Sequence, residues 1–131
     1  MSLFSKKPKP LPPAIKTVEE AGEFRIIRFQ GSLDIASVSL LEEHVRKIKA
    51  EKSFQYKNVL LDFAEVDYID SSAIAMVVRC VSDYKKSHHR MGILNLRSEP
   101  LNMLEITRVD QLIRVYPTYE EAARDLSAPP A

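Results

Sequence analysis

The sequence predicts an α/β fold in which a mixed, mainly parallel sheet of four or five strands is flanked by about four helices. Short apolar runs rich in β-branched residues alternate along the chain with amphipathic segments of helical period. Such alternation is typical of βαβ units, whose strands are parallel. The first two strand patterns are instead separated by a hairpin turn at residues 20–23, which predicts one antiparallel pair. The expected element order is β-β-α-β-α-β-α-β-α.

The first half of the domain contains the hairpin and one helix. Residues 14–18 form a weak strand pattern, and residues 24–29 form a stronger strand of aromatic and β-branched residues. Gly31-Ser32-Leu33-Asp34 is expected to end this second strand, and a helix should follow. The apolar face of that helix recurs at helical spacing through Val38, Leu41, Val45 and Ile48.

A central strand opens the second half. The dense apolar run at residues 59–63 suits a strand that is covered on at least one face, and a short loop through residues 67–69 should follow. The next helix is expected to begin after Asp70, and residues 93–96 give another strand pattern. The apolar positions of the helix are Ile74, Val77, Val78 and Val81.

Two more helices and a last strand complete the pattern. Ser98-Glu99-Pro100 predicts a helix start, because proline is tolerated in the first turn. Residues 113–116 form the last strand pattern. Thr118 and Glu121 then have the spacing of a capping box at the start of the final helix. Its docking residues should be Tyr119, Ala122 and Leu126.

Size and charge narrow the class of protein. The chain has 131 residues, which suits one domain. Residues 1–13 carry three lysines and four prolines and should be a disordered basic tail, followed by a domain at 14–126 and a second loose end at 127–131. The rest of the chain has 16 basic against 18 acidic residues, a balance of −2. A slightly acidic body does not suggest nucleic-acid binding.

Several other kinds of site are not indicated. Cys80 lies among valines, which favours a buried, inert thiol. His88 and His89 are adjacent and would point apart on a helix, so no metal site is expected. The basic patch of Lys85, Lys86 and Arg90 could bind an anion or nucleotide, but no glycine-rich phosphate loop accompanies it. No cofactor is expected. No apolar stretch approaches the ~20 residues that span a bilayer, and no secretory signal is evident, so we expect a cytoplasmic protein without membrane insertion.

The junction Asp70-Ser71-Ser72 is the candidate functional site. It lies where a strand pattern gives way to a helix, and the N–H groups at a helix start favour added negative charge. Asp70 is the expected N-cap, accepting a hydrogen bond from the N–H of Ser72 or Ala73. A phosphate on one of the serines would add about −1.5 to −2 charges and repel an acidic or apolar partner. The alternative is an ordinary, well-capped helix.

These residues resemble a known family. Gly31-Ser32-Leu33-Asp34 is similar to a G-x-L-D turn that follows an early strand in that family. Residues 60–73 resemble its strand, its loop and its D-S-S-G junction. The family is the STAS domain, found in bacterial anti-sigma-factor antagonists and at the cytoplasmic ends of sulfate-type transporters. The resemblance extends over residues 14–126 and implies a STAS-like fold.

The resemblance implies a phosphorylation switch. In the antagonists the serine directly after the aspartate is phosphorylated, and this serine corresponds to Ser71. The unmodified protein would bind a serine kinase that is also an anti-sigma factor; phosphorylation would release it, and a phosphatase would restore binding. Asp34 corresponds to the aspartate that assists the kinase interaction. The residues expected to contact the partner are Asp34, Asp70, Ser72, Ala73 and Met76.

The sequence departs from the family in one respect and leaves an alternative open. Ala73 and Ala75 stand where the family has glycine. Alanine favours the helical conformation over glycine by about 1 kcal/mol per site, so the helix start should be stiffer. The alternative is a constitutive STAS subunit of a membrane transporter, such as a lipid ABC transport complex. An enzyme with Ser71 or Ser72 as nucleophile is not expected, because there is no G-x-S-x-G motif and His44 lies in a helix pattern.

Overall fold

The computed structural model describes residues 11–50, 58–86 and 90–127 of the chain. The expected tails lie largely outside these residues, as do His88 and His89, and the side chains of residues 45, 47–50 and 85–86 are also outside the description. Residues 11–13, which were expected in the first tail, are described. The carbonyl of Pro12 accepts a hydrogen bond from the N–H of Ile15 at 2.9 Å.

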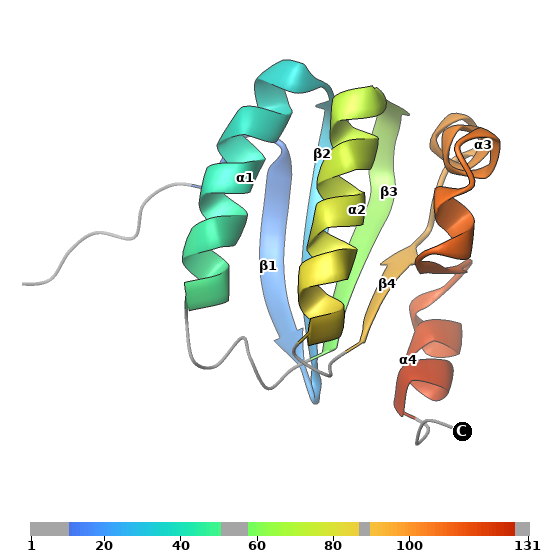
Figure 1. The fold of residues 1–131 in the computed structure, drawn as a ribbon. Helices are drawn as coiled ribbons and strands as arrows, with labels where there is room; N and C mark the ends of the chain where they lie inside the picture. The colour runs from blue at the N-terminus through green and yellow to red at the C-terminus, as the bar shows by residue number, and fades with distance from the viewer. Residues whose placement is uncertain (1–10, 51–57, 87–89, 128–131) are drawn as a thin grey trace, which may run out of the picture.

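The element order is the one that the sequence predicts, with one additional short 3-10 helix. Helices α1 and α2 lie side by side across one face of the sheet (Figure 1). The elements are β1 (Ile15–Ala21), β2 (Phe24–Leu33), α1 (Ile35–Ala50), β3 (Asn58–Ile69), α2 (Ser71–Lys86), β4 (Met91–Leu94), α3 (Ser98–Ile106), the 3-10 helix η2 (Val109–Gln111), β5 (Arg114–Tyr116) and α4 (Tyr119–Ser127).

The sheet has five strands in the spatial order β1-β2-β3-β4-β5. Strands β1 and β2 pair antiparallel, and the three remaining pairs are parallel. The mixed, mainly parallel sheet is therefore confirmed. Because parallel strands need crossover connections, α1, α2 and α3 each link neighbouring strands, and α1 and α2 begin at the same edge of the sheet.

Strands β2 and β3 are longer than the sequence predicts. Gly31 does not end β2; it has a φ of 78° and lies where the pairing register shifts, and the strand continues to Leu33. The prediction of a loop at residues 67–69 is also wrong, because β3 continues to Ile69. Glycine adopts a positive φ without strain and so permits a local irregularity inside a strand. The two strands pair to their last residues, Leu33 opposite Ile69.

Two apolar clusters cover opposite faces of the sheet. The larger one lies under α1 and α2 and includes Phe29 and Phe63, whose rings meet edge to face at 5.4 Å between centroids. The smaller one lies under α4. Its buried members are Phe24, Ile26, Leu60, Leu94, Tyr116, Ala122 and Leu126. Successive residues of the central strands thus pack against helices on opposite faces of the sheet, because side chains of a strand point alternately to its two faces.

The N-cap expected at the start of α4 is confirmed. The hydroxyl of Thr118 accepts a hydrogen bond from the N–H of Glu121 at 3.2 Å. Two predicted docking residues, Ala122 and Leu126, are buried, and Tyr119 contacts the ring of Phe24 at 6.2 Å between centroids. The cap and the apolar positions together fix α4 on the face of the sheet opposite α1 and α2.

Candidate functional site

The N-termini of α1 and α2 meet at the carboxyl edge of β2 and β3 (Figure 1). Asp34 follows β2 directly, and Asp70 follows β3. The backbone N–H of Asp70 donates to the carbonyl of Leu33 at 3.1 Å, which joins the two strand ends. Two residues that are far apart in sequence are therefore neighbours at two helix starts.

The carboxylate of Asp70 caps one helix and is hydrogen-bonded to the other. One oxygen, Oδ1, accepts from the N–H groups of Ser72 at 2.9 Å and Ala73 at 3.1 Å. The other, Oδ2, accepts from the N–H of Ile35 in the first turn of α1 at 3.1 Å. The predicted N-cap of α2 is confirmed. The bond to α1 was not predicted, because it depends on how two separate strands pair.

Hydrogen bonds favour the ionised form of Asp70. The hydroxyl of Ser72 donates to Oδ1, and this bond is the main reason that the pKa of the Asp70 carboxyl is lowered. Burial acts in the opposite direction, while the N–H groups of Ala73, Ser72 and Ile35 add to the lowering of the pKa. The carboxylate is a fixed negative charge between two positive helix ends.

Asp34 caps α1. Its Oδ1 accepts from the N–H of Ser37 at 3.1 Å, and its own N–H donates to the Ser37 hydroxyl oxygen at 2.9 Å. The carbonyl of Asp34 accepts from the N–H of Val38 at 2.8 Å. This reciprocal arrangement, which resembles a capping box, fixes the direction in which α1 leaves the sheet.

The two serines of the junction differ in accessibility. Ser71 is the first residue of α2 and is exposed. Within the described part of the chain, its hydroxyl makes no hydrogen bond. Ser72 is partly buried, and its hydroxyl is bonded to Asp70. Of the two hydroxyls, that of Ser71 is the one that an incoming protein can reach without breaking a cap.

Two residues of the expected contact set require a correction. Ala73 is 1% exposed and Met76 is 4% exposed, because both lie on the side of α2 that packs on the sheet. Their side chains therefore cannot contact a partner in this conformation. Ala75 is exposed, so of the two alanines that stand where the family has glycine, Ala75 is the one on the surface.

Exposed apolar side chains lie in the first turns of both helices that begin at this edge. Ile35, which precedes the first buried residue of α1, is 72% exposed although it is large and apolar. We call Ile35, Ala36, Ser71 and Ala75, all exposed in the first two turns of α1 and α2, the Ser71 surface. Ile35 was not among the predicted site residues. It lies three residues before Val38, a spacing that fits the apolar face of the helix, so no sequence pattern indicated that Ile35 is exposed.

A shallow groove borders the Ser71 surface. It has a volume of about 320 Å³ and lies between the segment before β1 and the first turns of α1. Its lining combines the capping residues of α1 with small apolar side chains. The lining residues are Pro12, Pro13, Ala14, Ser32, Asp34, Ala36, Ser37 and Leu40.

Three other features of the described ranges bear on function: possible metal ligands, the cysteine and the apolar character of the helices. No group of three or more histidine, cysteine, aspartate or glutamate side chains there could hold a metal ion. Cys80 is partly buried against the larger cluster. None of the helices in the described ranges combines the length and the apolar character needed to cross a bilayer.

The fold and the site define a small α/β domain with an exposed serine at two adjacent helix N-termini. A sequence model of the STAS domain matches residues 15–122, and the chain belongs to this family. The match covers every strand and helix up to the first turn of α4, including Asp34 and the Asp70-Ser71-Ser72 junction.

Solved structures share the fold. An anti-sigma factor antagonist from Mycobacterium paratuberculosis is 18% identical, with a TM-score of 0.75 over 89% of this chain and 97% of that chain. The anti-sigma factor antagonist SpoIIAA in its unphosphorylated form is 20% identical, with a TM-score of 0.63 over 86% and 96%. The murine anion transporter Slc26a9 is 19% identical, with a TM-score of 0.71, but the match covers 85% of this chain and 19% of the transporter.

Proposed function

We propose that this protein is a binding module that is switched by phosphorylation of Ser71, in the manner of an anti-sigma-factor antagonist. The unmodified Ser71 surface binds a serine kinase that is also an anti-sigma factor, and the phosphorylated form releases it. A phosphatase restores binding. The observation that supports this proposal best is the exposure of Ser71 beside a Ser72 whose hydroxyl is bonded to Asp70.

The local electrostatics suit a phosphate at this position. Ser71 is the first residue of α2, where helix N–H groups and the helix dipole favour an anion. The start of α1 lies next to it, since the N–H of Ile35 is bonded to Asp70. A phosphoserine here adds about −1.5 to −2 charges without opposing its own helix. The fold therefore tolerates the modification.

The same charge opposes binding of a partner to the Ser71 surface. Ile35, Ala36 and Ala75 offer apolar contacts, and a partner that covers them would exclude water from the phosphate. Removing water from a charged group without a compensating partner is costly. The negative charge of Asp70 adds repulsion toward acidic groups of the partner. Phosphorylation would thus weaken the complex and leave the domain folded.

The test combines mass spectrometry with binding. Protein purified from its source cells is mapped for phosphate, and the wild type, Ser71→Asp and Ser82→Asp are compared as bait for the kinase. Ser82 is exposed further along α2 and is the matched charge control. We expect phosphate on Ser71, and kinase binding weakened by more than about tenfold only in Ser71→Asp. Absence of phosphate in all growth conditions, with the kinase retained by Ser71→Asp, would contradict the proposal.

A second candidate is a STAS subunit that regulates a membrane transporter. The match to one part of Slc26a9 favours it, because a domain of this fold occurs within a transporter. In that case the wild type and Ser71→Asp would both bind a permease or its ATPase with equal affinity. The identity of the bound protein separates the two candidates.

A further inference from the structure

A cavity of about 390 Å³ lies at the other end of α2 from Ser71. Val81 and Tyr84 line it, and they are ten and thirteen residues beyond Ser71, or about 15–20 Å along a helix. The cavity is therefore separate from the Ser71 surface. Its lining comes from α2, β4, η2, β5 and α4 and from the segments that precede β4 and β5. The lining residues are Val81, Tyr84, Arg90, Met91, Asp110, Gln111, Leu112, Ile113, Arg114 and Leu126.

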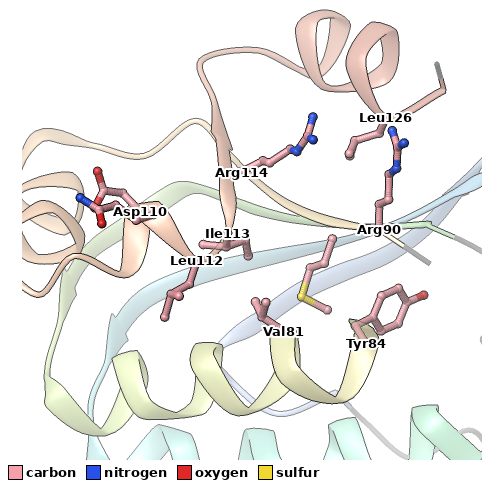
Figure 2. Close-up of a pocket in the computed structure, with 10 residues that line it drawn as sticks. Val81, Tyr84, Arg90, Asp110, Leu112, Ile113, Arg114 and Leu126 are labelled. Atoms are coloured by element: carbon pink, nitrogen blue, oxygen red, sulfur yellow. The ribbon is translucent and has the colours of Figure 1, made fainter. Parts of the chain in front are cut away.

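The walls of the cavity differ in chemistry (Figure 2). Val81, Leu112 and Ile113 form an apolar wall next to the helix, whereas Arg90 and Arg114 lie across from it, on either side of Leu126. Ligand sites in proteins have this character, with mostly apolar linings and a few polar groups that fix orientation. The volume is also within their usual range of about 300–1,000 Å³.

One residue positions both arginines. Nη1 of Arg90 donates to the backbone carbonyl of Asp125 at 3.2 Å, and Nη1 of Arg114 donates to the Asp125 carboxylate. The phenol of Tyr116 and the guanidinium of Arg114 lower the pKa of the Asp125 carboxyl, so it is ionised at neutral pH. A guanidinium has five N–H donors, so each arginine retains donors for a ligand.

The balance of charge argues against a polyanion as the ligand. Arg90 and Arg114 are permanently charged, while Asp110 and Asp125 are two acids within or beside the cavity. A polyphosphate would bring several negative charges into a site whose own charges nearly cancel. A single carboxylate needs only one planar pair of donors, which a guanidinium supplies. The apolar wall suits the remainder of such a ligand.

We propose that this cavity binds a small organic carboxylate with an apolar or aromatic body. The carboxylate accepts hydrogen bonds from Arg90 and Arg114, and the body packs on Val81, Leu112 and Ile113. The site does not depend on phosphorylation of Ser71. It connects elements on both faces of the sheet, since Val81 belongs to the larger apolar cluster and Leu126 to the smaller one.

The test is a titration of the full chain followed by amide NMR chemical shifts. The probes are cinnamate, its uncharged analogue cinnamamide, and ATP as a polyanion. Cinnamate should give saturable shifts at Val81, Met91 and Ile113 below about 10 mM, and cinnamamide should bind at least about tenfold more weakly, a difference of ~1.4 kcal/mol. Absence of saturation, equal binding of the amide, or tighter binding of ATP would each overturn the proposal.

Matched variants locate the binding site. Arg114→Gln removes a guanidinium that is 59% exposed and should weaken cinnamate binding about tenfold without unfolding the domain. Arg90→Gln is expected to act in the same way. Arg124→Gln removes the same charge from the exposed side of α4 and should leave binding unchanged. Equal weakening by Arg124→Gln would show only a general charge effect and would overturn the proposal.

Discussion

Asp70 joins two helices through one side chain. Its carboxylate accepts hydrogen bonds from the first turns of α2 and α1, so both helix starts depend on the same residue. An ordinary N-cap satisfies donors of one helix only. Ser71, which directly follows this capping residue, is exposed.

The first prediction concerns Asp70→Asn. An amide has one acceptor oxygen in place of two, so one of the two helix contacts is lost. We expect the free energy of unfolding at pH 7 to fall by about 1–2 kcal/mol, measured by urea denaturation. Asp67→Asn is the control, because Asp67 is exposed and accepts only a long bond of 3.3 Å from the hydroxyl of Ser32.

The difference in stability between the wild type and Asp70→Asn should depend on pH. The pKa of Asp70 is lowered in the folded state, so the unfolded chain binds the proton more readily. The stability that it contributes is present above the unfolded pKa of about 3.9 and is lost as the pH falls through the folded pKa. The difference between the wild type and Asp70→Asn should therefore shrink below about pH 4. A difference that stays constant down to pH 2 would contradict this explanation.

At the scale of elements, β4 and α4 are in close contact at Gly92. A Cβ at this position would lie 2.9 Å from a ring carbon of Tyr116 and 3.4 Å from a methyl carbon of Leu126. Both neighbours belong to the smaller apolar cluster, and Tyr116 is also held by Asp125 through its hydroxyl. The absence of a side chain at Gly92 therefore leaves room for the ring of Tyr116 from β5, against which Leu126 of α4 also lies.

Gly92→Ala should therefore destabilise the domain. The added methyl forces Tyr116 from its position, and overpacking of this kind costs about 1–3 kcal/mol. Urea denaturation measures the change. Ser82→Ala, on the exposed side of α2, should change stability by no more than about 0.5 kcal/mol. If Gly92→Ala were as stable as this control, the packing of Tyr116 against Gly92 would be looser than the structure shows.

At the scale of the whole molecule, the sheet connects two apolar clusters. The central strands contribute alternate side chains to both, so neither cluster can form without them. A domain of this size usually unfolds in one cooperative transition. Disruption of either face should therefore destabilise the whole domain.

Leu41→Ala and Leu126→Ala test this coupling. Leu41 is a buried residue of α1 and Leu126 a buried residue of α4, and each truncation should lower the free energy of unfolding by about 2–5 kcal/mol. Tyrosine fluorescence and circular dichroism should report one midpoint in both variants. The exposed Leu40→Ala is the matched control and should have little effect. Separate transitions in Leu126→Ala would show that α4 unfolds independently.

The sequence determined the features that depend on neighbouring residues. The order of strands and helices, the cap at Asp70 and the cap at Thr118 all follow from residues within one or two helical turns of each other. Local propensity and hydrogen bonding act over this range. The Asp70-Ser71-Ser72 junction was found in the same way, whereas the choice of Ser71 over Ser72 came from the resemblance to the STAS family.

The tertiary structure decided the features that join distant segments. Strand β2 continues past Gly31, and β3 continues to Ile69, because the two strands pair as far as Leu33 and Ile69. That pairing brings Ile35 to Asp70, and the packing of α4 brings Asp125 to both arginines of the second cavity. No local pattern specifies these contacts, because each depends on the register and packing of elements that are separated in the chain.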